Sequence, residues 1–264
     1  MLKILKKIYK SKFAIFIRTS RLYGYMHSKY YFKKNRHHVV QFPELNGKII
    51  DRWEDLKEAS RLKHLYQEKI YSFLSGKNHD EVVIIGCSFG HEVVHTHKQF
   101  PNTKIIGIDI DKECIQFCKS LSIPDCEFYE ADVTNKELLE KIFPDDGKSR
   151  VVISFETIYF ISPSGIKVMF DFFAKGGVKD ILIHTNTNIN NTGFNLFSCK
   201  KSKYSGIQGA WDHAMLNIPN YFPYHIQLLD QRLRATSVHY YQEPWLISYR
   251  LNGSWNDFFF DQTE

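Results

Sequence analysis

The chain has 264 residues, of which 43% are apolar, and this is enough for one large domain or for one domain with a helical extension. Its five cysteines include no Cys-x-x-Cys pair, and an odd cysteine count without a secretory leader argues against a disulfide framework or a zinc ribbon. We therefore expect a globular protein of the reducing cytoplasm. The formal net charge of +6 is spread unevenly along the chain.

Residues 1–40 form a strongly basic N-terminal arm. They contain eleven Lys or Arg and no acid, whereas the remaining residues carry 24 Lys or Arg against 29 Asp or Glu, a net charge of −5. Lysines between Lys3 and Lys10 recur at helical spacing opposite apolar residues, which predicts a basic amphipathic helix. The longest apolar run of the arm, 13–17, is too short for a signal peptide or a membrane span.

Three roles remain open for this arm. It can dock on the body of the protein as a cap or lid, which is the simplest role. It can also contact an anionic membrane, which would place a cytoplasmic protein peripherally at the inner face of a membrane. Nucleic acid is the third and least favoured partner. Because the basic residues are concentrated in the arm, any anionic macromolecule is expected to bind there and not across the whole surface.

Beyond the arm, the spacing of apolar residues in 51–80 predicts one long helix or two short ones, ending near Gly76. From residue 81 onward, short apolar runs alternate with helical segments. The predicted strands are 82–85, 104–108, 127–129, 151–155 and 180–184. Thr134 and Ser162-Pro163 are the expected N-caps of two of the helices between these strands.

The last part of the chain is predicted to complete this sheet. Residues 185–225 are expected to form an irregular insertion, followed by a helix over 224–233 and two strands over 235–241 and 244–252. Strands that alternate with helices indicate an α/β fold with a doubly wound, mostly parallel sheet. We expect a C-terminal antiparallel hairpin on this sheet and an N-terminal helical extension. The expected division is 1–78 for the arm and extension and 79–264 for the main domain.

An open parallel sheet binds its ligand beyond the carboxyl ends of its strands, so the residues that follow each strand are candidates for a site. The first strand leads into the turn formed by Gly86, Cys87, Ser88, Phe89 and Gly90. Its glycines allow the backbone to approach a ligand closely, and the helix that follows presents unpaired N–H groups.

The next three strands end in further candidates. Asp109, followed by Ile110, lies where a carboxylate can accept both hydroxyls of a ribose. Asp132, followed by Val133, lies where a carboxylate can accept the exocyclic amine of an adenine. Phe155 and Glu156 follow the fourth strand, on the floor of the same crevice.

The spacing of the glycines distinguishes between cofactors. A dinucleotide fingerprint needs glycine at positions one, three and six, but two of these three are Ser88 and His91. The pattern instead resembles class I S-adenosylmethionine-dependent methyltransferases, in which an apolar strand precedes Gly-x-Gly-x-Gly. Gly86 and Gly90 match the outer glycines, and Ser88 replaces the middle one.

The resemblance covers residues 81–184, together with the terminal hairpin, and implies a seven-stranded sheet with S-adenosyl-L-methionine as the cofactor. It places the turn 86–90 beneath the amino-acid part of the cofactor and Asp109, with Ile110, at the ribose. Asp132 and Val133 would flank the adenine. Phe155 and Glu156 would border the methyl-donor end.

Methyl transfer is an in-line displacement, so a hydroxyl acceptor must be aligned with the methyl group and must lose its proton. His184, after the fifth strand, and His213, within the insertion, are the two candidates for the base. His91 and Glu92 are interpreted as structural or cofactor-side groups. No metal ligands are predicted.

We therefore expect a methyltransferase, most simply an O-methyltransferase with a small-molecule or carbohydrate-type acceptor. The segment after the fourth strand lacks an Asn-Pro-Pro-Tyr-like signature, which argues against the amino-methylating enzymes of DNA, RNA or protein glutamine that share it. Two alternatives remain: an RNA methyltransferase that holds phosphates with the basic arm, and a non-catalytic scaffold with the same fold.

Overall fold

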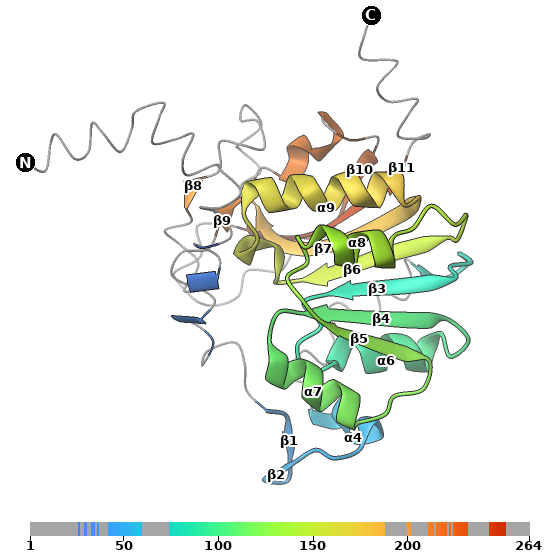
Figure 1. The fold of residues 1–264 in the computed structure, drawn as a ribbon, viewed down its shortest axis with the longest axis vertical. Coiled ribbons are helices and arrows are strands. Elements are labelled where there is room, and N and C mark those ends of the chain that lie inside the picture. The colour runs from blue at the N-terminus through green and yellow to red at the C-terminus, as the bar shows by residue number, and fades with distance from the viewer. Residues whose placement is uncertain are drawn as a thin grey trace, which may run out of the picture.

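The computed structural model describes residues 26, 29–30, 33–34, 36, 42–59, 74–187, 200–201, 211–213, 215–220, 222, 224–231 and 243–251. A seven-stranded sheet forms its centre, in the order β10-β11-β7-β6-β3-β4-β5 (Figure 1). Its strands are β3 (Glu81–Ile85), β4 (Lys104–Asp109), β5 (Cys126–Glu130), β6 (Arg150–Phe155), β7 (Val178–Thr187), β10 (Tyr224–Gln231) and β11 (Glu243–Leu251).

The five strands from β3 to β7 pair in parallel and confirm the predicted strands, with ends that differ by at most three residues. The chain runs outward from β3 to β4 and β5, and then returns to β6 on the other side of β3. This reversal places the switch point of the doubly wound sheet beside β3, where ligands of such sheets bind.

The C-terminal antiparallel pair is confirmed, but one of its members is not the predicted one. Residues 224–231 form strand β10, so the prediction of a helix over 224–233 was wrong. β10 pairs antiparallel with β11, and β11 pairs antiparallel with β7. The strand predicted over 235–241 lies outside the described residues. Because β7 continues to Thr187 and β10 begins at Tyr224, the connection between them is shorter than the expected insertion 185–225.

Helices cover both faces of the sheet. One face carries α4 (Trp53–Ala59), α6 (His91–Gln99) and α7 (Lys112–Ser120), and the other carries α8 (Lys136–Ile142), α9 (Pro163–Lys175) and the 3-10 helix η3 (Met215–Asn220). Ser162 caps α9 as predicted, with Pro163 at the first helical position. The N-cap of α8 is Asn135 and not Thr134, because the Asn135 side chain accepts the N–H of Leu138.

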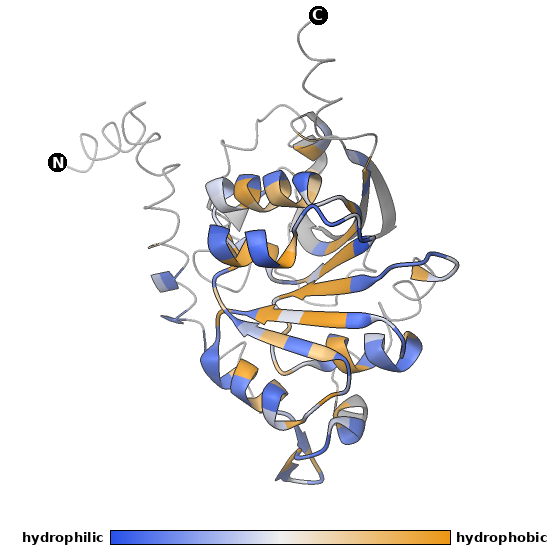
Figure 2. Cartoon of the chain, turned by 45° about the vertical axis from the view of Figure 1, so that its right-hand side comes forward, coloured by the Kyte–Doolittle hydropathy of each residue, from blue (hydrophilic) through white to orange (hydrophobic). Residues whose placement is uncertain are grey.

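The core follows the alternation of strand side chains. Val83 and Ile85 of β3 pack with α8 and α9, whereas Val82 and Ile84 pack with α6 and α7. Figure 2 shows the result: the central strands are hydrophobic, and the helices turn their hydrophilic sides outward. Leu56 of α4 is fully buried in the same core as α6, so this part of the N-terminal extension packs directly on the sheet domain.

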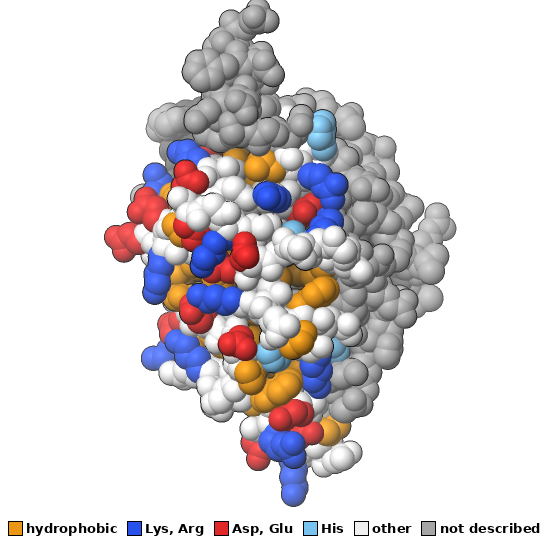
Figure 3. Space-filling model, turned by 90° about the vertical axis from the view of Figure 1, so that its right-hand side faces the viewer, with side chains coloured by type: hydrophobic (Ala, Val, Ile, Leu, Met, Phe, Trp, Pro, Cys, Tyr) orange, Lys and Arg blue, Asp and Glu red, His pale blue; other side chains and the backbone are white. Residues whose placement is uncertain are grey.

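The amino ends of the strands carry a network of ion pairs. The Arg150 side chain is 1% exposed, and its guanidinium donates to Glu81 over 2.8 Å and to Asp146 over 2.7 Å. Lys77 lies 3.0 Å from Asp180 at the same edge. Figure 3, which views this side of the molecule, shows both signs of charge interspersed. The amino ends of the strands are therefore stabilised by paired charges, whereas the candidate residues lie at the carboxyl ends.

The described part of the N-terminal region contains one element that the sequence reasoning missed. Strands β1 (Glu44–Leu45) and β2 (Lys48–Ile49) form a small hairpin around Asn46 and Gly47. The helix expected over 51–80 is confirmed for α4, whereas residues 60–73 and the predicted helix of residues 1–17 lie outside the described residues. Among the helices that the structure describes, none combines the length and the apolar character that crossing a membrane requires.

Candidate functional site

The turn after β3 has an unusual backbone that explains its residue types. Gly86, Ser88 and Gly90 all adopt positive φ angles, of 73°, 46° and 83°. A Cβ atom on Gly86 would lie 1.9 Å from Oγ1 of Thr157, so a side chain cannot be accommodated there. Ser88 keeps the left-handed conformation that the resemblance assigns to a glycine, although L-residues adopt it at a cost. Ser88 therefore adopts a backbone conformation that glycine adopts more readily.

The carboxylate of Asp109 joins this turn to the loop after β4. Its Oδ2 accepts the backbone N–H of Ser88 over 2.8 Å, and its Oδ1 accepts the N–H of Asp111 over 2.8 Å. Burial raises the pKa of the Asp109 carboxyl, while these backbone donors favour its charged form. The carboxylate is thus held in one orientation at the end of β4, beside the glycine turn.

Two apolar side chains follow the ends of β4 and β5. Ile110 is 38% exposed, which is unusual for a large apolar residue, whereas Val133 is buried. Asp132 fixes its own turn, because its Oδ1 accepts the N–H of Thr134 over 2.8 Å and the hydroxyl of Thr134 over 2.7 Å. The exposed Ile110, next to the half-buried Asp109, is a surface that a flat apolar ring could cover.

The side chains of the other two residues of the glycine turn lie in the hydrophobic core. Cys87 is fully buried and Phe89 is 2% exposed. The Phe89 ring packs against Phe42, with centroids 4.9 Å apart, and against Phe117 at 5.3 Å. Their side chains therefore build the core beneath the turn, and their contribution to a ligand is limited to the backbone.

The segment after β6 presents a carboxylate in a strained conformation. Glu156 has a φ of 51°, and its N–H donates to the backbone carbonyl of His184 over 2.9 Å. The Glu156 side chain is 44% exposed, and its Oε1 lies 3.8 Å from Nδ1 of His184. His184 is itself 1% exposed and stacks on Phe155, with ring centroids 6.1 Å apart. The structure therefore brings His184 to the carboxyl edge of the sheet, behind Glu156.

His213 lies in a different environment. It is 2% exposed, and its Nε2 is 3.1 Å from the carbonyl oxygen of Ile158 and 2.9 Å from that of Ile161. Ile158 is the first residue of the 3-10 helix η1 (Ile158–Phe160), and Ile161 follows its last residue. Because carbonyls only accept, Nε2 must carry the proton. Burial lowers the pKa of His213 to about 4. This geometry anchors the segment after β9 (Trp211–Asp212), which pairs with β8 (Lys200–Lys201), to the turn after β6.

Glu92, which the sequence indicates as a structural or cofactor-side group, lies in the first turn of α6. Burial, together with the nearby carboxylates of Glu156 and Asp109, raises the pKa of its carboxyl to about 7. The signal in the sequence was its position two residues after Gly90, at the start of the helix that follows the turn. Three carboxyl groups thus lie near one another at the carboxyl ends of the strands, an arrangement that favours a cationic ligand.

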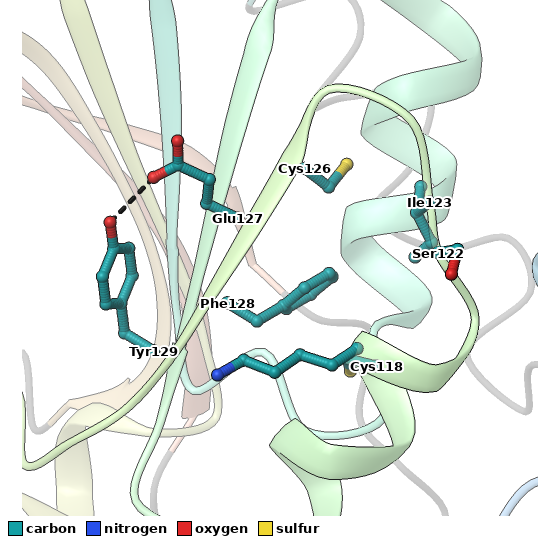
Figure 4. Close-up of a pocket in the computed structure, with 8 residues that line it drawn as sticks. Cys118, Ser122, Ile123, Cys126, Glu127, Phe128 and Tyr129 are labelled. Carbon is teal, nitrogen blue, oxygen red and sulfur yellow. Dashed lines mark hydrogen bonds between the residues drawn. The ribbon is translucent and has the colours of Figure 1, made fainter.

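A separate pocket of about 310 Å³ lies between α7 and the edge strand β5 (Figure 4). Phe128 faces α7, whereas Tyr129 lies on the other side of the strand and donates to Glu127 over 2.7 Å. None of the candidate residues at the strand ends lines this pocket. In the described part of the chain, no group of three or more His, Cys, Asp or Glu side chains is placed to hold a metal ion.

Comparisons with known proteins support the fold. No family model and no curated protein matches the sequence. Among solved structures, the N-terminal domain of EvdMO1 with S-adenosylhomocysteine bound matches with a TM-score of 0.55 and 13% identity, covering 85% of this chain and 97% of that one. The N-methyltransferase NodS from Bradyrhizobium japonicum WM9, in complex with S-adenosyl-L-homocysteine, matches with a TM-score of 0.53 and 11% identity, covering 84% and 99%.

The bifunctional kinase-methyltransferase WbdD also matches, with a TM-score of 0.45 and 14% identity over 70% of this chain. The present chain spans only 37% of the length of WbdD. The matches to EvdMO1 and NodS cover 97% and 99% of those chains, with TM-scores above 0.5. The chain therefore has the fold of the class I S-adenosylmethionine-dependent methyltransferases.

Proposed function

We propose that the chain is an S-adenosyl-L-methionine-dependent methyltransferase whose cofactor lies at the carboxyl ends of β3, β4, β5 and β6. The observation that carries this proposal is the Asp109 carboxylate, held by the N–H groups of Ser88 and Asp111 beside a turn with three left-handed residues. Such a carboxylate is oriented before a ligand arrives, which favours the binding of ribose hydroxyls. When bound, the cofactor supplies an electrophilic methyl group on a sulfonium.

Each strand end has a separate part in this proposal. The backbone of 86–90 and the N–H groups of α6 lie beneath the amino-acid part, and Asp109 accepts from the ribose. Ile110 and Val133 cover the faces of the adenine, with Asp132 at its edge. Phe155 and Glu156 border the methyl-donor end.

We further propose that the reaction is O-methylation and that the pair formed by Glu156 and His184 takes the proton of the acceptor hydroxyl. The Glu156 carboxylate is exposed at the carboxyl ends of the strands, and Nδ1 of the buried His184 lies 3.8 Å from its Oε1. The geometry does not favour His213 as the base, because its Nε2 donates to two carbonyls inside the protein. We therefore assign His213 a structural role.

The acceptor we propose is a small hydroxylated molecule or a carbohydrate. The basic arm of residues 1–40 would bring such an enzyme to an anionic membrane surface, where lipid-carried acceptors are found. A vesicle-sedimentation assay with anionic and neutral vesicles tests this, using a variant that lacks residues 1–17. If the full chain instead binds RNA with a steep salt dependence and ignores vesicles, the RNA methyltransferase alternative is favoured.

The reaction itself is tested with radiolabelled S-adenosylmethionine and a panel of hydroxylated sugars, phenols and small amines. We expect label in hydroxyl acceptors, and a loss of about 10²-fold or more in turnover for Glu156→Gln and His184→Asn. Glu127→Gln is the matched control, because Glu127 lies on the edge strand beside Lys104 and Tyr129. Transfer only to amines would contradict O-methylation, and cofactor binding without any transfer would support the scaffold alternative.

A further inference from the structure

The N-terminal region contributes an arginine to the cofactor edge of the sheet. Arg36 Nε lies 2.5 Å from Oδ2 of Asp111, and its Nη2 lies 3.1 Å from Oδ1 of the same carboxylate. The Nη2 group also lies 2.7 Å from Glu113 Oε2. Figure 1 shows the darkest blue pieces, which are the described residues between 26 and 36, on the side where the arrows of the parallel strands end. Two parallel N–H bonds to one carboxylate are the most directional form of ion pair in proteins.

Asp111 connects this ion pair to the loop that follows β4. Its carboxylate is 5% exposed and caps α7 by accepting the N–H groups of Glu113 and Cys114 over 3.0 and 3.2 Å. Its own N–H donates to Oδ1 of Asp109 over 2.8 Å. Arg36 is therefore joined to Asp109 through a single intervening residue.

These contacts fix the Asp109–Asp111 loop. Two of its residues have different roles in the proposed site. Asp109 is the proposed ribose ligand, and Ile110 is the proposed wall of the adenine. A second residue from the same part of the chain reinforces the arrangement, because Phe42 packs on Phe89 of the glycine turn and on Phe117 of α7. The N-terminal region thus contacts both loops that would hold the cofactor.

We infer that Arg36 is a positioning residue for the nucleoside half of the cofactor, acting through Asp111 on the Asp109–Asp111 loop. Without the guanidinium, the buried Asp111 carboxylate keeps only its backbone partners, and the loop loses the contact that fixes its outer side. This inference rests on the proposed function, since it assumes that Asp109 and Ile110 face an adenine nucleoside.

The test is calorimetric titration of the full chain with S-adenosylhomocysteine and with 5′-methylthioadenosine, which retains the nucleoside half and lacks the amino-acid half. Arg36→Ala should weaken both ligands by the same factor, about ten-fold. Arg36→Lys keeps the charge but not the two-pronged contact, so it should recover only part of the loss. Asp111→Asn keeps an oxygen that can cap α7, and its effect should not add to that of Arg36→Ala.

Glu113→Gln is the matched control. It removes the other carboxylate that pairs with Arg36, but that side chain is 54% exposed and lies on the solvent side of the pair. We expect wild-type affinity for this variant. If Glu113→Gln weakens binding as much as Arg36→Ala, the effect is one of surface charge and the inference is overturned.

Other results of these titrations also decide whether Arg36 positions the cofactor loop. Wild-type affinity in Arg36→Ala would overturn the inference while leaving the proposed function standing. A loss confined to S-adenosylhomocysteine, with 5′-methylthioadenosine unaffected, would overturn it too, because the effect would then lie in the amino-acid half. If Arg36→Ala does not fold, Arg36→Lys decides between the same outcomes. Failure of the wild-type chain to bind either ligand would refute the proposed function itself.

Discussion

Asp109 accepts a hydrogen bond from the backbone N–H of Ser88, so a side chain at the end of β4 holds the turn that follows β3. The two loops lie on neighbouring parallel strands, and this bond fixes them relative to each other. The same carboxylate is the proposed ribose ligand. Its structural and binding roles are thus combined in one group.

Asp109→Asn tests the binding role. The amide keeps one oxygen that can accept an N–H, but it loses the charge and the second acceptor. We expect the affinity for S-adenosylhomocysteine to fall by about 10- to 100-fold, measured by calorimetry, because a charged acceptor is worth more than a neutral one. Circular dichroism should remain that of the wild type. Unchanged affinity would remove Asp109 from the ribose contact.

Gly86→Ala should destabilise the protein through two separate costs. The left-handed conformation costs an L-residue about 1–2 kcal/mol, and the clash with Thr157 adds about 1–3 kcal/mol. Gly147→Ala is the matched control, because Gly147 has a φ of +74° against +73° for Gly86, and an added Cβ at Gly147 would meet no atom within 4 Å. Urea unfolding should therefore show a larger loss for Gly86→Ala.

The clash with Thr157 can be removed by a second substitution in the Gly86→Ala variant. Adding Thr157→Gly to Gly86→Ala removes the side chain that the new Cβ would meet. Part of the lost free energy of unfolding should return. Equal losses for Gly86→Ala and Gly147→Ala would show that Thr157 does not cover the turn in solution.

Glu92 makes the free energy of unfolding depend on pH. Its pKa is raised from 4.5 to about 7 in the folded protein, so the folded state binds more protons than the unfolded state between these values. Stability from this group is therefore lost as the pH rises from 4.5 through 7. Glu92→Gln stays neutral, and in urea unfolding it should gain on the wild type from pH 5 to pH 8.

The same carboxyl should couple cofactor binding to proton release. A bound sulfonium and ammonium would favour the charged form of Glu92, so the affinity for S-adenosylmethionine should rise with pH near 7, by at most about ten-fold per pH unit. Glu92→Gln should flatten this dependence. Calorimetry in buffers of different ionisation enthalpy measures the released proton directly, and an equal release in Glu92→Gln would assign it to another group.

His213 has the opposite dependence on pH. Its pKa is lowered from 6.5 to about 4, so the unfolded state binds more protons in this interval and stability falls as the pH drops from 6.5 to 4. This contribution is about 3 kcal/mol at most. His213→Gln keeps a donor near the position of Nε2 and does not titrate. Its urea-unfolding curve should therefore lose less stability than the wild type between pH 7.5 and pH 5.

A role of His213 as catalytic base predicts a different result. His213→Gln would then abolish methyl transfer at a temperature where the variant is fully folded. With the structural role that we propose, turnover per folded molecule should stay near that of the wild type. The two roles are separated by measuring activity and unfolding on the same preparation.

The parallel strands could be predicted because they are buried on both faces and read as continuous apolar runs, such as 82–85. The β10 segment was missed because its alternation, Tyr224 with Ile226 and Leu228, is interrupted by a register shift between Leu228 and Asp230. The apolar residue between Leu228 and Asp230 gives this segment a spacing of apolar residues that is also typical of a helix. The partner strand β11 begins only at Glu243, well after β10 ends at Gln231. The two strands are therefore not joined by a short turn that the sequence could reveal.

The β1–β2 hairpin was missed for another reason. Its strands have two residues each, too few to show alternation. The available signal was the pair Asn46 and Gly47, which have φ angles of 53° and 75° and belong to the commonest type of tight hairpin turn.

The site was predictable where topology alone brings residues together. Gly86, Asp109 and Glu156 end neighbouring parallel strands, so their proximity follows from the strand order. Arg36 was not predictable, because its ion pair with Asp111 spans 75 residues and no periodic pattern reports such a contact. The burial of His184 behind Glu156 likewise depends on tertiary packing against Phe155.

A crystal structure of the full chain with S-adenosylhomocysteine tests the central claim most directly. The account predicts ribose hydroxyls within hydrogen-bond distance of the Asp109 carboxylate and adenine between Ile110 and Val133. It also predicts the sulfur near Phe155 and Glu156, with the guanidinium of Arg36 still paired to Asp111. Ligand density in the pocket between α7 and β5, or a ribose held by other residues, would contradict it.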